Sequence, residues 1–163
     1  MQSFKIHVTK DYLMFCSGHF ITYSGHQCEP LHGHNYRVGV FVEGALNEDW
    51  YVFDFVTLKR LMKRLIDDLD HRMLLPLHNP WIKISQKDDH VIATYKERTY
   101  MFPQGDVVLL PIENTTAELL ARYLAGRAKA DLARYATQGL SAIEVEVEET
   151  TGQSAIYRET LEG

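Results

Sequence analysis

Several common features are scarce in this chain of 163 residues. Only two cysteines occur, Cys16 and Cys28, which is too few for a disulfide framework, so a reduced, cytoplasmic setting is expected. No apolar run approaches the length of a membrane span, and the first residues lack the basic-then-apolar pattern of a signal peptide. No basic tract is present and the net charge is −5. Neither nucleic acid nor a membrane is therefore an expected partner.

What the chain does have is the composition of an ordinary globular domain, with 45% hydrophobic and 24% charged residues. We expect a single domain over residues 1–163. Alternating apolar residues predict strands, and two amphipathic stretches predict helices. The predicted strands cover residues 4–15, 35–43, 143–148 and 154–158, with a short extended run at 50–53. Short turns and two helices of similar length indicate an α+β fold, in which helices cover one face of an antiparallel sheet.

The ends of the two helices are predicted from their capping residues. Asp54 is a predicted N-cap, and the helix after it is expected to end near residues 70–72. Thr115 and Glu118 have the spacing of a capping box, which opens the second helix. Gly139 is the predicted end of that helix.

The segment 77–112 has a less regular pattern. Residues 90–95 and 98–102 are predicted to form a hairpin, and residues 107–110 form a further apolar run. We expect this hairpin to be an addition to the basic fold.

Three histidines are candidate metal ligands. His32 and His34 lead directly into the second predicted strand, and side chains two positions apart on a strand face the same side. Neutral imidazole is a common zinc ligand. His19 ends the preceding apolar run, so three rings converge if the two strands are neighbours. Three protein ligands leave the fourth tetrahedral position open, as in catalytic sites. The alternative is that these are ordinary strand and loop histidines.

The two cysteines are expected to have different roles. Cys28 lies four positions before His32, and a thiolate there would serve as a base or nucleophile. The same spacing is equally consistent with a fourth zinc ligand or an inert buried thiol. Cys16 lies in an apolar strand and is expected in the core.

Three further acidic or imidazole groups could take part in chemistry. Asp70 and His71 are adjacent, and a carboxylate can hold an imidazole in one tautomer for proton transfer. A histidine at a helix end is also what the helix dipole favours. Glu149 ends an acidic strand and could bind the amidine-like edge of a heterocycle through two hydrogen bonds, although a solvated acidic face is the default explanation. Glu118 is explained by helix capping.

Taken together, these residues resemble the 6-pyruvoyltetrahydropterin synthase / 6-carboxytetrahydropterin synthase family. The resemblance covers most of the chain outside 77–112, and the Cys-x3-His-Gly-His spacing looks most like bacterial 6-carboxytetrahydropterin synthases of 7-deazaguanine (queuosine) synthesis. The matching positions are His19, Cys28, His32-Gly33-His34-Asn35-Tyr36, Asp49-Trp50, Asp54-Phe55, Leu58-Lys59, Leu69-Asp70-His71, Thr116-Ala117-Glu118, Glu149-Thr150 and Ile156-Tyr157-Arg158.

The resemblance implies the tunnelling fold, with a four-stranded antiparallel sheet backed by two helices. Subunits of this fold join edge to edge into an oligomeric barrel, as trimers paired into hexamers, with active sites at subunit interfaces. By position the resemblance implies that His19, His32 and His34 are Zn²⁺ ligands and that Cys28 is the base. It also implies that Asp70 and His71 form a proton relay, and that Glu149 anchors the pterin and joins this relay. Glu118 would be a capping residue with a minor part in the pocket.

The implied substrate is 7,8-dihydroneopterin triphosphate, and the implied products are 6-carboxy-5,6,7,8-tetrahydropterin, acetaldehyde and triphosphate. A triphosphate sits awkwardly with the net negative charge, so local cations are expected to offset it, with Arg37, Lys83 and Lys87 as candidates. The segment 77–112 is longer than compact bacterial members need, and it could cover the pocket mouth or extend an oligomer contact.

Glu29 is a second departure, because it completes a Glu-x-x-His-Gly-His pattern. Within the family this pattern resembles members that make 6-hydroxymethyl-dihydropterin for folate, so Glu29 is a candidate substrate-binding group or else a solvated loop acid. A 6-pyruvoyl product, a non-catalytic zinc or pterin-binding module and an unrelated zinc hydrolase remain further alternatives.

Overall fold

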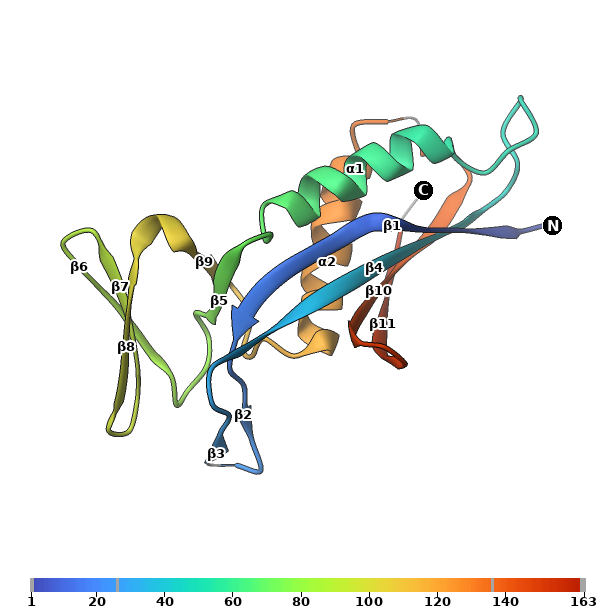
Figure 1. Cartoon of the computed structure of the whole chain (residues 1–163). Coiled ribbons are helices and arrows are strands. Elements are labelled where there is room, and N and C mark those ends of the chain that lie inside the picture. The colour runs from blue at the N-terminus through green and yellow to red at the C-terminus, as the bar shows by residue number, and fades with distance from the viewer. Residues whose placement is uncertain (1, 26, 136, 162–163) are drawn as a thin grey trace.

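The computed structural model describes residues 2–25, 27–135 and 137–161. Its main sheet has six strands in the order β11-β10-β4-β1-β5-β9 (Figure 1). In the run β11-β10-β4-β1 each strand is antiparallel to its neighbour, whereas β5 pairs parallel with β1 and β9 parallel with β5. The expected α+β fold is confirmed, but the expectation of only four strands was wrong. The bounds are β1 (Phe4–His19), β4 (His32–Gly44), β5 (Arg72–Pro76), β9 (Val107–Leu110), β10 (Leu140–Thr150) and β11 (Gln153–Thr160).

Two helices, α1 (Phe55–Asp67) and α2 (Ala117–Leu132), cover one face of this sheet (Figure 1). Asp54 caps α1 as predicted, since its carboxylate accepts a hydrogen bond from the Thr57 backbone N–H at 2.6 Å. The helix ends at Asp67, three residues before the predicted end, and a turn follows it.

The start and end of α2 differ from the prediction. Its N-cap is Thr116, whose hydroxyl accepts from the Leu119 backbone N–H at 3.4 Å. Thr115 is fully buried before the helix, so Glu118 does not close the predicted capping box around it. The helix ends at Leu132, before the predicted stop. Gly139 has a positive φ of 86° and lies instead in the turn into β10.

The main core lies between the sheet and the helices. Alternate residues of β4 and β10 face the helices, and the apolar stripes of α1 and α2 cover them. Buried members include Val38, Val40, Val42, Ile143, Val145, Val147, Leu58, Met62, Leu65, Leu120 and Leu124. The large buried apolar area supplies the main free energy that holds the helices on the sheet.

β1 contains a break in regular pairing. Its register against β4 shifts between Thr9 and Met14. Beyond this shift, the odd-numbered residues Phe15, Ser17 and His19 are buried, while Cys16 is exposed. The expectation that Cys16 belongs to the core was wrong, because adjacent residues on a strand point to opposite faces.

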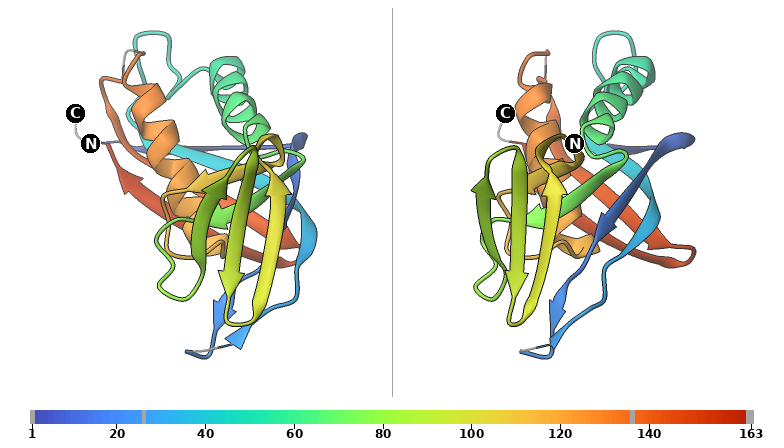
Figure 2. Two further views of the ribbon diagram at one scale, coloured as in Figure 1. Left: turned by 90° about the vertical axis from the view of Figure 1, so that its left-hand side faces the viewer. Right: turned by 60° about the vertical axis from the view of Figure 1, so that its left-hand side comes forward.

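A second sheet is built from the segment 77–112. β6 (Lys83–Lys87), β7 (His90–Tyr95) and β8 (Arg98–Pro103) are antiparallel, so the predicted hairpin is confirmed and has a third strand. A 3₁₀ turn, η1 (Gln104–Asp106), leads from it into β9. Figure 1 shows this sheet at one end of the molecule, and in Figure 2 that end is turned toward the viewer.

The segment between β1 and β4 contains the short hairpin of β2 (Thr22–Tyr23) and β3 (Gln27–Cys28). One local prediction was wrong. Residues 50–53, expected to be extended, form bends and no strand. Trp50 there has a positive φ of 66°, which regular strands do not adopt.

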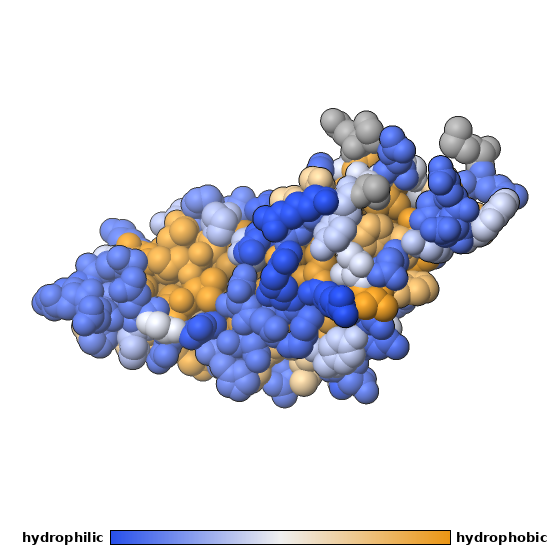
Figure 3. Space-filling model, turned by 90° about the horizontal axis from the view of Figure 1, so that it is seen from above, coloured by the Kyte–Doolittle hydropathy of each residue, from blue (hydrophilic) through white to orange (hydrophobic). Residues whose placement is uncertain are grey.

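No helix in the described ranges is long and apolar enough to cross a membrane. On the face seen in Figure 3, hydrophilic and hydrophobic residues are interspersed.

Candidate metal centre and active site

The three candidate histidines come together where β1 and β4 pair. In the antiparallel register His19 lies opposite His32, and Ser17 lies opposite His34. One ligand nitrogen from each of the three histidines lies within 4.8 Å of the others. The ring centroids of His32 are 4.8 Å from those of both His19 and His34. The predicted convergence of the three rings is therefore confirmed.

Backbone carbonyl groups orient two of these rings. The Nδ1 of His19 is 2.9 Å from the Thr115 carbonyl oxygen, and the Nδ1 of His32 is 2.8 Å from that of Pro30. If each Nδ1 donates to its carbonyl, each Nε2 presents a lone pair, which is the usual arrangement of a metal-ligating histidine. The Nε2 of His19 is buried and has no hydrogen-bond partner among the described residues. A buried nitrogen without a partner fits a position meant for a metal ion.

The electrostatics also fit a cation. Burial is the largest cause that lowers the pKa of His19 to about 4, against the opposing hydrogen bond to Thr115. The ring is therefore neutral near pH 7, as a metal ligand must be. Glu149 Oε1 lies 3.5 Å from the Nε2 atoms of both His19 and His34. The nitrogens of a tetrahedral zinc site lie about 3.4 Å apart. The three imidazole nitrogens lie within 4.8 Å of one another, so small side-chain rotations would bring them to that spacing.

Cys28 and Glu29 point to different surroundings. Cys28 is buried in a second apolar cluster with Phe20 and Met73, and its thiol donates to the Glu29 carbonyl at 3.6 Å. It is not a member of the histidine group. The Glu29 carboxylate lies 3.8 Å from His32 Nε2. Of these two neighbours, the carboxylate is therefore the one in contact with the triad.

The burial of Cys28 affects its ionisation. Burial raises the pKa of the thiol, the Arg98 guanidinium opposes that shift, and the Glu29 carboxylate adds to it. A thiolate at this position therefore depends on nearby positive charge.

Asp70 and His71 form the predicted pair at the surface. The Asp70 carboxylate lies 3.0 Å from His71 Nδ1 and accepts a hydrogen bond from the Cys16 backbone N–H at 2.8 Å. Partial burial opposes ionisation of Asp70, but these hydrogen bonds outweigh it and hold its pKa below the usual value. The His71 side chain is 83% exposed. Across the described residues, no hydrogen bond or ion pair connects this pair to the triad or to Glu149.

The remaining predicted groups lie outside this cluster. Glu118 is exposed on the first turn of α2. Arg37 is exposed and lies 3.8 Å from Asp11, and Lys83 and Lys87 are exposed on β6. Arg37 lies on β4 of the main sheet, whereas Lys83 and Lys87 lie on β6 of the second sheet.

Sequence reasoning missed two supports of the triad. Tyr36 is buried, and its hydroxyl lies 3.2 Å from His19 Nδ1. It could have been found from its position two residues beyond His34, on the same face of β4. The Thr115 carbonyl had no sequence signal, because it reaches His19 across 96 positions of the chain.

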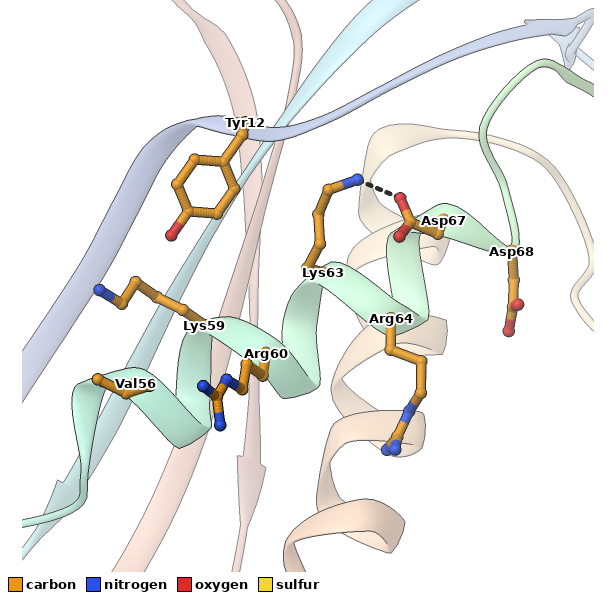
Figure 4. A pocket seen from close by; sticks show the side chains of 8 residues that line it. All are labelled: Tyr12, Val56, Lys59, Arg60, Lys63, Arg64, Asp67 and Asp68. Atoms are coloured by element: carbon orange, nitrogen blue, oxygen red, sulfur yellow. Dashed lines mark hydrogen bonds and ion pairs between the residues drawn. The ribbon is translucent and has the colours of Figure 1, made fainter.

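A separate pocket of about 550 Å³ lies between β1 and α1 (Figure 4). Lys63 pairs with Asp67 there, and Arg64 pairs with Asp131 of α2 at 2.5 Å. The pocket shares no lining residue with the triad. Its lining residues are Tyr12, Val56, Lys59, Arg60, Lys63, Arg64, Asp67 and Asp68.

The fold and the site define a class of α+β proteins in which three histidines from two neighbouring strands lie close enough together to bind a metal ion. The family model for 6-pyruvoyl tetrahydropterin synthase matches residues 7–160. The chain belongs to this family.

Individual relatives extend along most of the chain. A Methanocaldococcus jannaschii protein named "Putative 6-carboxy-5,6,7,8-tetrahydropterin synthase" is 37% identical over 152 residues, which cover 92% of each chain. The Aquifex aeolicus 6-carboxy-5,6,7,8-tetrahydropterin synthase is 30% identical over 136 residues, or 82% of this chain and 76% of that protein.

A solved structure of Plasmodium vivax 6-pyruvoyltetrahydropterin synthase has a TM-score of 0.91 and 30% identity, covering 98% of this chain and 99% of that one. A second structure of that enzyme, also with a TM-score of 0.91, has alanine in place of a glutamate that is described as a catalytic residue.

Proposed function

We propose that this protein is a zinc-dependent 6-carboxy-5,6,7,8-tetrahydropterin synthase of queuosine biosynthesis. It would convert 7,8-dihydroneopterin triphosphate to 6-carboxytetrahydropterin, acetaldehyde and triphosphate. The observation that carries this proposal is the cluster of three histidines, in which the buried Nε2 of His19 has no hydrogen-bond partner among the described residues. The names of relatives that match most of the chain support the identity of the product.

In this proposal His19, His32 and His34 hold the zinc ion. When bound, zinc supplies Lewis-acid polarisation of the substrate's side-chain oxygens, which acidifies the neighbouring C–H bonds. The Cys28 thiolate takes a proton from the substrate side chain, and His71 carries the second proton transfer. Glu149 binds the amidine-like edge of the pterin ring, and its distance of 3.5 Å from two triad nitrogens would keep that ring close to the metal.

The proposal includes a homo-oligomer, a trimer or hexamer with active sites at subunit interfaces. The exposed Asp70–His71 pair supports this arrangement, because no hydrogen bond or ion pair of the described residues links it to the triad of its own subunit. A neighbouring subunit would bring the pair to the metal site of the next one. This arrangement would also join the exposed cations Arg37, Lys83 and Lys87 to the triphosphate.

A second candidate function is the cleavage of the same substrate to 6-hydroxymethyl-dihydropterin, with Glu29 as the base. The 3.8 Å distance between its carboxylate and His32 Nε2 favours this alternative. The P. vivax 6-pyruvoyltetrahydropterin synthase, in which a glutamate is described as a catalytic residue, supports only the use of a glutamate in catalysis. A Pyrococcus furiosus protein named dihydroneopterin monophosphate aldolase is 44% identical over 46 residues, which are 28% of this chain and 40% of that protein.

Incubation of the purified protein with zinc and 7,8-dihydroneopterin triphosphate, with products separated by mass, tests both candidates. We expect 6-carboxytetrahydropterin from the native protein, and loss of that product with full zinc content in Cys28→Ala. Full activity of Cys28→Ala would remove the thiol from the mechanism. A hydroxymethyl product that disappears in Glu29→Gln would establish the second function instead. Bound zinc without any product would indicate a binding module.

A further inference from the structure

A single arginine joins the β6–β8 sheet to the segment that carries both candidate bases. Arg98 is the first residue of β8, directly after the turn from β7. Its Nη1 donates to the carbonyl of Cys28 at 3.2 Å and to that of Glu29 at 3.3 Å. Hydrogen bonds from a charged donor are among the stronger ones in proteins. This contact is therefore a firm link between two segments about seventy positions apart.

The same segment is also held by Ile21. The Glu29 backbone N–H donates to the Ile21 carbonyl at 3.0 Å, and the Ile21 N–H donates to the Glu29 carboxylate at 3.2 Å. The hydrogen bonds to Arg98 and Ile21 together restrict rotation of the backbone at Cys28 and Glu29. The thiol thus points into the apolar cluster, while the carboxylate points toward His32.

We propose that Arg98 is a positioning residue that fixes the directions of Cys28 and Glu29 relative to the histidine triad. The effect of Arg98 on kcat rests on the proposed function, whereas its effect on the positions of Cys28 and Glu29 does not. It gives the segment 77–112 a role, since the second sheet would act as the support of the catalytic segment. A misplacement of about 1 Å in a reacting group can lower a rate by about 100-fold.

The charged groups around the thiol are few. Arg98 and Glu29 are the two whose charge acts on Cys28, and Lys96 and Glu97 of the β7–β8 turn line the same pocket of about 450 Å³. This pocket gives a small alkylating reagent a route to the thiol. The reactivity of Cys28 therefore reports on Arg98 without any turnover.

The test compares Arg98→Gln and Arg98→Lys with Arg134→Gln, an exposed arginine whose carboxylate partner Asp131 lies at 3.8 Å. For Arg98→Gln we expect kcat for the pterin product to fall about 10- to 100-fold with KM nearly unchanged. Arg98→Lys keeps a charged donor and should recover part of kcat, while Arg134→Gln should match the native protein. Zinc content should be equal in all four proteins.

Iodoacetamide labelling as a function of pH gives the second readout, with peptide mass spectrometry separating Cys28 from Cys16. In Arg98→Gln the midpoint for Cys28 should move to higher pH, because the nearby positive charge is lost. An unchanged kcat and an unchanged labelling midpoint would overturn the proposal, as would a rise in KM alone, which would make Arg98 a substrate-binding residue. If the native protein forms no pterin product, the proposed function fails while the labelling still decides the role of Arg98.

Discussion

Removal of one triad histidine should remove most of the stabilisation of the protein by zinc. His34 is a better position for this substitution than His19, because its side chain is partly exposed, at 17%, whereas that of His19 is buried beside Thr115. His34→Ala takes away one of three ligand nitrogens and leaves the core under the helices intact. The variant should fold without metal as the native protein does, and differ from it when zinc is added.

The size of the effect follows from mass action. A ligand at 100 times its Kd stabilises the folded state by about 2.7 kcal/mol. For a chain of this size, 1 kcal/mol raises Tm by about 2–4 °C, so zinc should raise the native Tm by roughly 5–11 °C. Loss of a partner that only hydrogen-bonds a zinc ligand weakens zinc binding by up to about 100-fold. Loss of a ligand itself should weaken zinc binding by about 100-fold or more. At the same zinc concentration the variant then gains only about 0.4 kcal/mol.

The assay is thermal unfolding with and without zinc at one protein concentration, together with metal analysis of the purified proteins. His78→Ala is the matched control, since it replaces an exposed histidine outside the triad and should keep the full zinc-dependent shift. A full shift in His34→Ala, or no shift in the native protein, would show that the three rings do not form a zinc site.

Three further predictions concern assembly and stability. Cys28→Ala and His71→Ala, each inactive alone, should recover activity when refolded together, because a mixed oligomer contains intact sites at some interfaces; no recovery at any mixing ratio would place both groups in one subunit. Thr116→Ala should lower the free energy of unfolding by about 1 kcal/mol through loss of the α2 cap, while Thr116→Gly should cost only a few tenths of a kcal/mol. Leu65→Ala should cost about 2–5 kcal/mol in urea unfolding, against less than about 0.5 kcal/mol for the exposed Val56→Ala on the same helix.

The convergence of the triad could be predicted because it needs only local rules. Two histidines with one residue between them share a face of any strand, and an antiparallel neighbour places His19 beside His32. The cap of α1 at Asp54 is equally local. These features depend on residues a few positions apart, or on one pairing of neighbouring strands.

Features that depend on distant contacts could not be predicted. β5 and β9 are short apolar runs, and their parallel pairing with the main sheet depends on segments far apart in the chain. The exposure of Cys16 depends on which face of β1 meets the helices, and an apolar run hides that alternation. The approach of Glu149 to the triad depends on β10 pairing with β4.

The register shift in β1 has a consequence for how the chain tolerates changes in length. Val8 and Phe15 both face the helices, although seven positions separate them and a regular strand would send them to opposite sides. The irregular stretch absorbs this odd count, so the two halves of β1 are geometrically independent. A residue inserted between Thr9 and Met14 should be accommodated locally, whereas one inserted between Phe15 and His19 should turn the imidazole to the outer surface.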